Sequence, residues 1–401
     1  MPVLKHLKRM FTDWFLCGML LATFLAYVFP HFGSTGGAMH AEWVINIGVF
    51  LVFFLHGVNL SSEQISHGLK NIRLHVMVQG FTFIVFPLIW VVANKLLGAH
   101  IPPLLMLGFF YLCALPSTIS SSVALTGSAG GNVPAAILNA SLSSVLGIFL
   151  TPLLVSFVVG SGAGGIDLGS TLLDLCAMLL LPLVLGQLVR PLCGRFFARH
   201  KRYTNICDKV VILLLVYAAF CNSMVSGMWQ QQGSSVIVSA LVGSAVLLAI
   251  ILWMTTRTAR ALKFSTADEI AAVFCASKKS LAAGAPMAAL IFGANPGLGL
   301  ILLPIMIYHP LQLIVCSVMA ESYATRSRAE AKHNNISGGS GLARIAPIAS
   351  KPAPTDGYRS IIAVTPCPPA AQIEIKPRPC PAVASSLDIL VTIRPPVAAN
   401  G

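Results

Sequence analysis

The sequence predicts an all-α polytopic membrane protein with ten transmembrane helices. Of its 401 residues, 56% are hydrophobic and only 10% are charged, whereas a soluble protein carries roughly 25% charged residues. The mean hydropathy is +0.81. Ten apolar runs follow one another, each near the ~20 residues that a helix needs to cross a bilayer. Most basic residues lie between these runs, so the net charge of +13 indicates contacts with membrane lipid and no nucleic-acid partner.

The first five runs are expected to form one half of the protein. The run at residues 14–30 follows basic residues as a signal peptide would, but it is long for one and no small-residue cleavage site follows it. It is therefore predicted to be an uncleaved span. The other four spans of this half are expected at residues 43–60, 74–97, 102–130 and 133–159.

A glycine-rich hinge at residues 160–165 leads to five further runs. They predict spans at residues 168–189, 210–228, 236–254, 270–292 and 298–320. Beyond them, residues 327–401 hold eleven of the 25 prolines and no helical periodicity, which is typical of an extended, disordered segment. The domains predicted are residues 1–160, residues 161–324 and a cytoplasmic tail at residues 325–401.

Lysine and arginine predict the orientation. The N-terminal flank and the loops after the second, sixth and eighth spans hold fourteen of them, whereas the loops after odd-numbered spans hold only Lys95. Positive residues mark the cytoplasmic side, so both termini are expected in the cytoplasm.

Five spans in each half make the second half an inverted repeat of the first. The test is whether unusual features recur at matching positions. The fourth span of each half is interrupted by polar residues with Pro or Gly, at residues 116–122 in the first half and 277–286 in the second. Paired interruptions of this kind indicate a transporter's site near the middle of the membrane.

Lys278 and Lys279 stand within the second interruption. Ionisable groups at membrane depth are costly and usually functional. The pair fits three roles: a counter-charge for an anion, a fixed cation in place of a coupling ion, or a proton carrier. Alternatively, one lysine reaches an interface along its stem. Adjacent residues point about 100° apart on a helix, so only one need face a site.

Further polar residues complete the candidate substrate or ion site. Their side chains either ligate an ion or substrate, or bond to helix carbonyls and pack between helices. They are Thr118, Ser120, Ser121, Ser122, Asn139, Ser141, Ser277, Ser280, His309, Gln312 and Gln79.

Enzymes and channels fit the sequence poorly. It contains no HExxH, P-loop or GxSxG motif and no repeated ring of filter-like groups. The main hypothesis is a secondary transporter that moves a small organic anion by alternating access, without a cofactor. The alternative is a non-transporting membrane regulator of ion homeostasis or cell-envelope processes.

Several blocks resemble the bile acid:sodium symporter (BASS) family, which includes bacterial inner-membrane symporters. They are residues 115–132, 150–152, 268–270, 278–282 and 286–287, and the resemblance extends over about residues 10–323. It implies a transporter of the inner (plasma) membrane. It also implies a panel made of spans one, two, six and seven, and a core in which the broken fourth and ninth helices cross beside sodium sites.

The resemblance also implies positions for sodium ligands. Carried over by position, they fall near Ser121 and Ser122, beside Asn139, and near Ser277. The family's glutamate falls near residues 273–274, where this chain has Val and Phe, and two lysines follow a turn later. Three alternatives therefore stay open. Transport is coupled to Na⁺, as the resemblance implies, or to H⁺ through a lysine, or a lysine ammonium supplies the positive charge that sodium would otherwise supply.

Overall fold

A computed structural model describes residues 14–59, 71–160, 168–227, 229–230, 233, 235–293 and 295–337 of the protein. The chain divides into a unit of residues 1–339 and a unit of residues 340–401, and the second unit lies outside the described residues. All regular structure in the described ranges is helical, as the sequence predicts. The tail predicted at residues 325–401 falls outside the description after Ser337.

Helices occupy every predicted span, but those of the sixth and tenth spans run past their predicted ends at residues 189 and 320, and that of the seventh begins before residue 210. The first half contains α2 (Trp14–Val28), α3 (Pro30–Gly33), α4 (Ala41–Asn59), α6 (Ile72–Gly80), η1 (Phe81–Val85), α7 (Phe86–Leu97), α8 (Pro103–Ala114), α9 (Ile119–Ser128) and α10 (Val133–Gly160). The second half contains α11 (Leu168–Arg199), α12 (Lys201–Val225), α14 (Ser235–Ala261), α15 (Thr266–Ala276), α16 (Leu281–Phe292) and α17 (Leu298–Ser337).

Six stretches of helix are long and apolar enough to cross a membrane, at Ala41–Val58, Ile72–Leu97, Val133–Val159, Arg202–Val225, Ser235–Ala261 and Leu298–Arg328. A seventh candidate is the pair α8–α9, which bends by 59° at its break. Two shorter apolar stretches lie at Trp14–Val28 and Met178–Gly194. By length and composition, the described residues therefore form an integral membrane protein.

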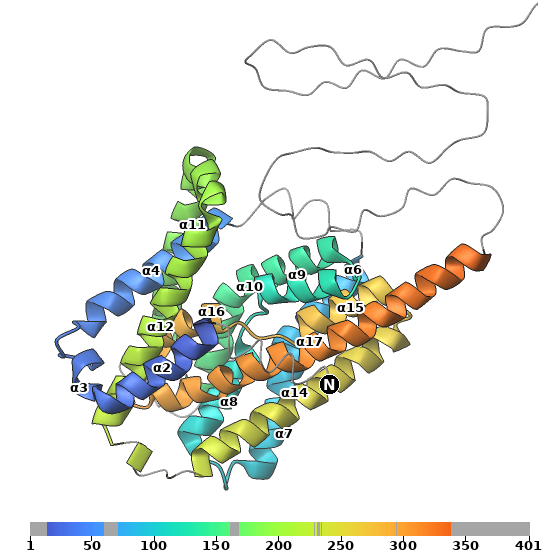
Figure 1. The fold of residues 1–401 in the computed structure, drawn as a ribbon. Helices are drawn as coiled ribbons and strands as arrows, with labels where there is room; N and C mark the ends of the chain where they lie inside the picture. The colour runs from blue at the N-terminus through green and yellow to red at the C-terminus, as the bar shows by residue number, and fades with distance from the viewer. Residues whose placement is uncertain are drawn as a thin grey trace, which may run out of the picture. The chain divides into compact units, whose positions relative to one another are not determined.

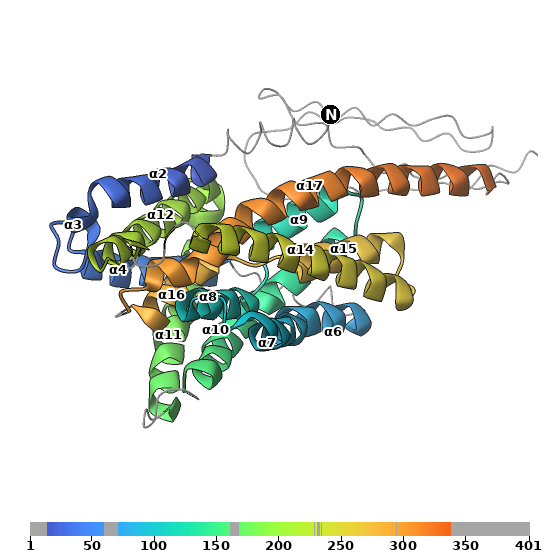
Figure 2. The same ribbon diagram turned by 90° about the horizontal axis from the view of Figure 1, so that it is seen from below.

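The helices of residues 14–339 pack in two groups (Figure 1). In one group, α4 packs along α11, and α12 packs against α2, α3 and α4. In the other, α17 packs against α8 and α14, while α15 packs against α6, α9, α10 and α14. Figure 2 shows α14, α15 and α17 running side by side. Helix α16 contacts α4 and α12 of the first group and α17 of the second.

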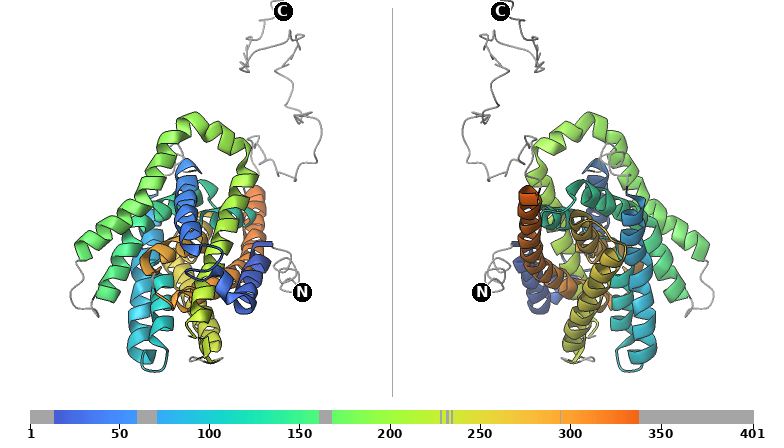
Figure 3. Two further views of the ribbon diagram at one scale, coloured as in Figure 1. Left: turned by 90° about the vertical axis from the view of Figure 1, so that its left-hand side faces the viewer. Right: turned by 90° about the vertical axis from the view of Figure 1, so that its right-hand side faces the viewer.

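The last helix continues beyond the residue where the tail is expected to begin. Helix α17 runs to Ser337, and Figure 3 shows it in orange, with α14 in yellow beside it. Its interior prolines, Pro304 and Pro310, lie in the apolar part. Residues 325–337, predicted to belong to the tail, are therefore helical.

Candidate functional site

The first helix break follows from Pro116. A proline has no N–H to donate to the carbonyl four residues earlier and disfavours helix at the residue before it. Leu115 is accordingly extended, with ψ 151°, and α8 ends at Ala114. Helix α9 begins again at Ile119. The carbonyls of residues 113–116 therefore need donors from outside their own helix.

The second break lies at residues 277–280, between α15 and α16. The Ser277 N–H still donates to the Val273 carbonyl at 3.1 Å, which closes α15. Ser280 is extended and caps α16, because its Oγ accepts the Ala283 N–H at 3.2 Å. The two lysines lie between these serines, where the chain is not helical.

The two breaks lie against each other. The Ser280 N–H donates to the Pro116 carbonyl at 2.9 Å. The Ser117 hydroxyl donates to the Cys275 carbonyl at 2.6 Å, and the Ser122 hydroxyl donates to the Phe274 carbonyl at 3.2 Å. Each break thus supplies donors to carbonyls that the other leaves free.

Lys279 is completely buried, and its ammonium is completely hydrogen-bonded. Its Nζ donates to the carbonyls of Thr82 at 2.8 Å and of Cys113 and Leu115 at 2.7 Å each. An ammonium has three N–H donors, so all of them are used. The Phe86 ring centroid lies 4.0 Å from Nζ, close enough for a cation–π interaction.

The Thr82 carbonyl is free for Lys279 because of a second proline. In η1 the hydrogen bonds run from residue i+5, and the Phe86 N–H donates to the Phe81 carbonyl. The next donor in this register would be residue 87, which is a proline and has no N–H. The π segment and Pro87 together leave the Thr82 carbonyl without a partner in its own helix.

Lys278 is also completely buried, but the described residues offer its amine no hydrogen bond. Its Nζ lies 5.9 Å from the centroid of the Phe274 ring. A buried polar group without a partner is costly and calls for an explanation. The two neighbouring lysines thus differ in their hydrogen bonds: the Lys279 amine donates three, and the Lys278 amine has no acceptor among the described residues.

Helix α17 holds the backbone of the second break. The Gln312 Oε1 accepts the Lys279 N–H at 2.9 Å, and its Nε2 donates to the Lys279 carbonyl at 2.8 Å. The Tyr308 hydroxyl donates to the Ser277 carbonyl at 2.8 Å. His309 is half-buried, with Nδ1 3.1 Å from the Gln312 Nε2. Of the predicted residues on α17, Gln312 contacts the break directly and His309 lies next to it.

The predicted hydroxyl side chains at the first break differ in burial and in hydrogen-bond partners. Ser122 bonds to α15 as described, and the Ser121 hydroxyl donates to the Thr118 Oγ1 at 3.0 Å. Ser120, in the first turn of α9, is exposed. Ser277 donates its own hydroxyl to the Val273 carbonyl at 2.7 Å.

The predicted amides lie between α6 and α10. The Gln79 Nε2 donates to the Asn139 carbonyl at 3.0 Å, and the buried Asn139 side chain donates to the Ala135 carbonyl at 2.9 Å. The Gln79 Oε1 has no partner among the described residues. Ser141 is buried nearby on α10. The sodium set of Ser121, Ser122, Asn139 and Ser277 stays a prediction.

Several groups at the breaks are absent from the predicted set. The Ser143 Oγ accepts the Ser117 N–H at 2.9 Å, and the Thr151 hydroxyl donates to the Ala114 carbonyl at 2.8 Å. Backbone carbonyls of Thr82, Cys113 and Leu115 hold Lys279 as described. One sequence feature could have indicated that these carbonyls lack partners in their own helices. A proline follows each of them within a few residues, at position 87 after Thr82 and at position 116 after Cys113 and Leu115.

A second polar cluster lies at the start of α15. The buried Glu269 carboxylate accepts from Arg260 at 3.0 Å, from Arg326 at 3.3 Å and from the Tyr323 hydroxyl at 3.0 Å. The Asp268 carboxylate accepts from Asn132 at 2.8 Å and from Asn71 at 3.1 Å. These bonds tie the ends of α6, α10, α14 and α17 to α15.

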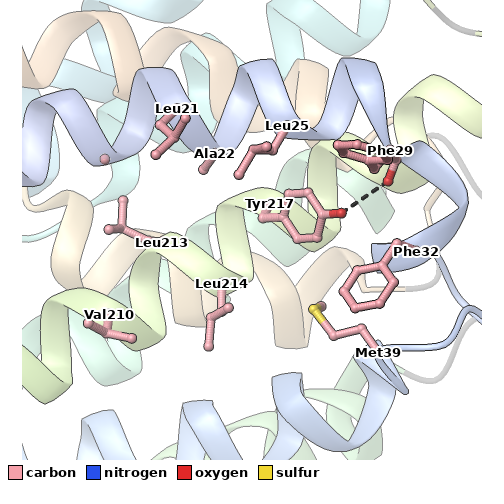
Figure 4. A pocket seen from close by; sticks show the side chains of 11 residues that line it. Leu21, Ala22, Leu25, Phe29, Phe32, Met39, Val210, Leu213, Leu214 and Tyr217 are labelled. Atoms are coloured by element: carbon pink, nitrogen blue, oxygen red, sulfur yellow. Dashed lines mark hydrogen bonds between the residues drawn. The ribbon is translucent and has the colours of Figure 1, made fainter.

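An apolar groove of about 580 Å³ lies in the other group of helices, between α2, α3 and α12. Figure 4 shows Leu21, Leu25, Leu213 and Leu214 lining it, with the Tyr217 hydroxyl donating to the Phe29 carbonyl at 3.0 Å. No charged residue lines it. The groove therefore offers no counter-charge to an anion, unlike the region of the two breaks.

Comparison with known proteins identifies the family. Over 314 residues the chain is 43% identical to the "Putative symporter YfeH" of Escherichia coli, covering 78% of this chain and 92% of that protein. It is 42% identical to the uncharacterized protein PA2026 of Pseudomonas aeruginosa, over 80% of this chain and 95% of the relative.

Vertebrate proteins match at lower identity. The sodium/bile acid cotransporter 7 of Danio rerio is 33% identical over 80% of this chain and 96% of its own length. The family model that matches residues 13–325 is the SBF-like CPA transporter family. The match takes in both helix breaks and all the helices around them. The chain belongs to the SBF-like CPA transporter family.

Proposed function

We propose that the protein is a secondary transporter that moves a small organic anion across the membrane by alternating access at the two helix breaks. Membership of a transporter family supports this proposal, as do relatives named as a symporter and as bile acid cotransporters. The observation that carries it is the Lys278 amine, a buried positive group beside two broken helices for which the described part of the chain supplies no hydrogen-bond partner.

The proposed carrier has ten spans in two inverted repeats. The six long helices, the bent pair α8–α9 and the two shorter apolar helices leave the pair α15–α16, which would complete ten. The repeats would be residues 1–160 and 161–324, with both termini in the cytoplasm and the protein in a bacterial inner membrane. The near-equal lengths of the helices on either side of each break support the repeat.

Lys278 would act as the counter-charge for the anion. Burial strengthens the interaction of a charge with its partner, and an anion would supply the acceptor that the amine lacks. The surrounding polar set would orient the substrate: Thr118, Ser120, Ser121, Ser122, Asn139, Ser141, Ser277, Ser280, His309, Gln312 and Gln79. Coupling would be to Na⁺, through the predicted set of hydroxyls and Asn139, or to H⁺ through a lysine.

The test is uptake into proteoliposomes by the protein and by Lys278→Met. The probes are taurocholate, as a bile-acid anion, and a panel of small radiolabelled carboxylates. We expect uptake of at least one probe by the unchanged protein and a loss of at least tenfold in Lys278→Met. Lys95→Met is the matched control, because Lys95 is exposed at the end of α7, and it should transport normally.

Two results would contradict the proposal. If no anion in the panel enters the vesicles or shifts the melting temperature of the purified protein, the regulator hypothesis is favoured. If Lys278→Met transports as well as the unchanged protein, Lys278 is not the counter-charge. Replacing Na⁺ by K⁺ and then collapsing the pH gradient separates the two coupling ions.

A further inference from the structure

The surroundings of the Lys279 ammonium are those of a cation-binding site. Three backbone carbonyls converge on Nζ at 2.7–2.8 Å, and the face of Phe86 lies 4.0 Å from it. No carboxylate of the described residues pairs with this amine. Converging carbonyl oxygens are the ligands with which some membrane proteins replace the hydration shell of a monovalent metal ion.

The carbonyl set does not depend on the lysine for its existence. Pro116 removes a donor from the ladder of α8, and Ser117, which would otherwise donate to the Cys113 carbonyl, donates to Ser143 instead. Pro87 and the π segment free the Thr82 carbonyl. Because prolines in two separate spans create the acceptors, removal of the amine would leave them facing one another with no donor.

The set is also held in place by groups other than Lys279's amine. The Thr151 hydroxyl holds the Ala114 carbonyl between two of the acceptors, and the Ser280 N–H holds the Pro116 carbonyl beside them. The Trp90 Nε1 donates to the Met106 carbonyl at 2.8 Å, which ties α7 to α8. These bonds would keep the distance between Thr82 and Leu115 when residue 279 is shortened.

We infer that the Lys279 ammonium is a tethered cation in a three-carbonyl site, and that a small monovalent cation can take its place when the amine is removed. The inference deepens the proposed function, because it makes a bound metal ion unnecessary at this point of the carrier. Lys278 keeps the proposed role of counter-charge for the anion, and Lys279 has the separate role of a cation bound to the three carbonyls. The test measures stability and needs no transported substrate, so a failure of the transport assay leaves it intact.

The experiment compares the purified full-length protein with Lys279→Ala, Lys279→Met and Lys278→Ala. Melting temperature is measured at one ionic strength with Na⁺, K⁺, methylammonium or the bulky N-methylglucamine cation. We expect Lys279→Ala to melt several degrees below the unchanged protein in N-methylglucamine and to recover, with a saturable dose dependence, in at least one small cation. Lys279→Met should not recover, because its side chain fills the space.

The unchanged protein and Lys278→Ala should lack this recovery. Stabilisation by Na⁺ bound elsewhere in the carrier would appear in all the variants alike, so the inference rests on the additional response of Lys279→Ala. Equal melting of Lys279→Ala in every cation would overturn the inference, and so would an equal saturable response in Lys278→Ala or in the unchanged protein. If Lys279→Ala cannot be purified in N-methylglucamine, the amount of folded protein recovered from membranes solubilised in each small cation tests the same stabilisation. Failure to recover it in any of them would also overturn the inference.

Discussion

The two helix breaks lie in contact, but their backbone carbonyls receive hydrogen bonds from different kinds of donor. At the first break, the carbonyls of Cys113 and Leu115 both depend on one charged group, the Lys279 ammonium. At the second break, four carbonyls receive neutral donors from the first break, from α9 and from α17: Cys275 from Ser117, Phe274 from Ser122, Ser277 from Tyr308, and Lys279 from Gln312. The first break therefore relies on one charged side chain for two of its carbonyls, while the Thr151 hydroxyl and the Ser280 N–H hold the Ala114 and Pro116 carbonyls. The second break relies on neutral donors for all four of these carbonyls.

This difference predicts that the largest loss of stability follows from the loss of Lys279. Lys279→Met leaves three buried carbonyls without donors, and each unpaired group costs ~1–3 kcal/mol. We expect the free energy of unfolding to fall by about 3 kcal/mol or more. Lys278→Met is the matched comparison and should melt at the same temperature or higher, because it removes a buried amine that has no hydrogen-bond partner within the described ranges.

Thermal unfolding of both variants in detergent checks this prediction. Equal destabilisation by the two substitutions would mean that the ammonium's three hydrogen bonds do not distinguish Lys279 from its neighbour. The stability of the first break would then not depend on the Lys279 ammonium more than that of the second break depends on each of its neutral donors.

A smaller effect is expected when a neutral group of the second break is removed. Gln312→Leu leaves the N–H and the carbonyl of Lys279 unpaired, and two unpaired groups should cost about 2 kcal/mol. Unfolding measurements on the same preparation check the ranking. If Gln312→Leu lowered the free energy of unfolding more than Lys279→Met does, the second break would be the more sensitive of the two to the loss of one side chain.

The smallest effect distinguishes two neighbouring serines on α10. Ser143→Ala removes the acceptor of the Ser117 N–H and should cost about 1 kcal/mol. Ser144 donates to the Ala140 carbonyl of its own helix, a bond that adds little or even weakens a helix. Ser144→Ala should therefore change the melting temperature by no more than the error of measurement, and equal losses in the two variants would contradict the assignment.

The sequence predicts much of this arrangement. The apolar runs predict the helices, and Pro116 and the polar residues around Lys278 and Lys279 locate the two breaks. The structure brings these breaks into contact, and Gln312 and Ser122, both predicted candidates, lie at that contact. Side-chain identity and span length are local properties of the chain, which is why they can be read without a structure.

The partners of Lys279 could not be predicted in the same way. They are backbone carbonyls, which every residue has, and only the register of hydrogen bonds in η1 and α8 decides which ones are free. Adjacent helical positions differ by about 100°, so the sequence indicates that the two lysines face differently but not which of them is satisfied. Ser120 illustrates the same limit, since it stands among buried candidates and yet is exposed.

The ion pair between Arg326 and Glu269 has a practical consequence for shortened versions of the protein. The family match ends at residue 325, one residue before Arg326, whose guanidinium lies 3.3 Å from the buried carboxylate. A truncation made at the edge of the match would discard that arginine and leave Arg260 as the remaining basic partner that the structure pairs with Glu269 in its described residues. Expression plasmids for crystallography or cryo-EM are better ended after Ser337, where the described part of α17 stops.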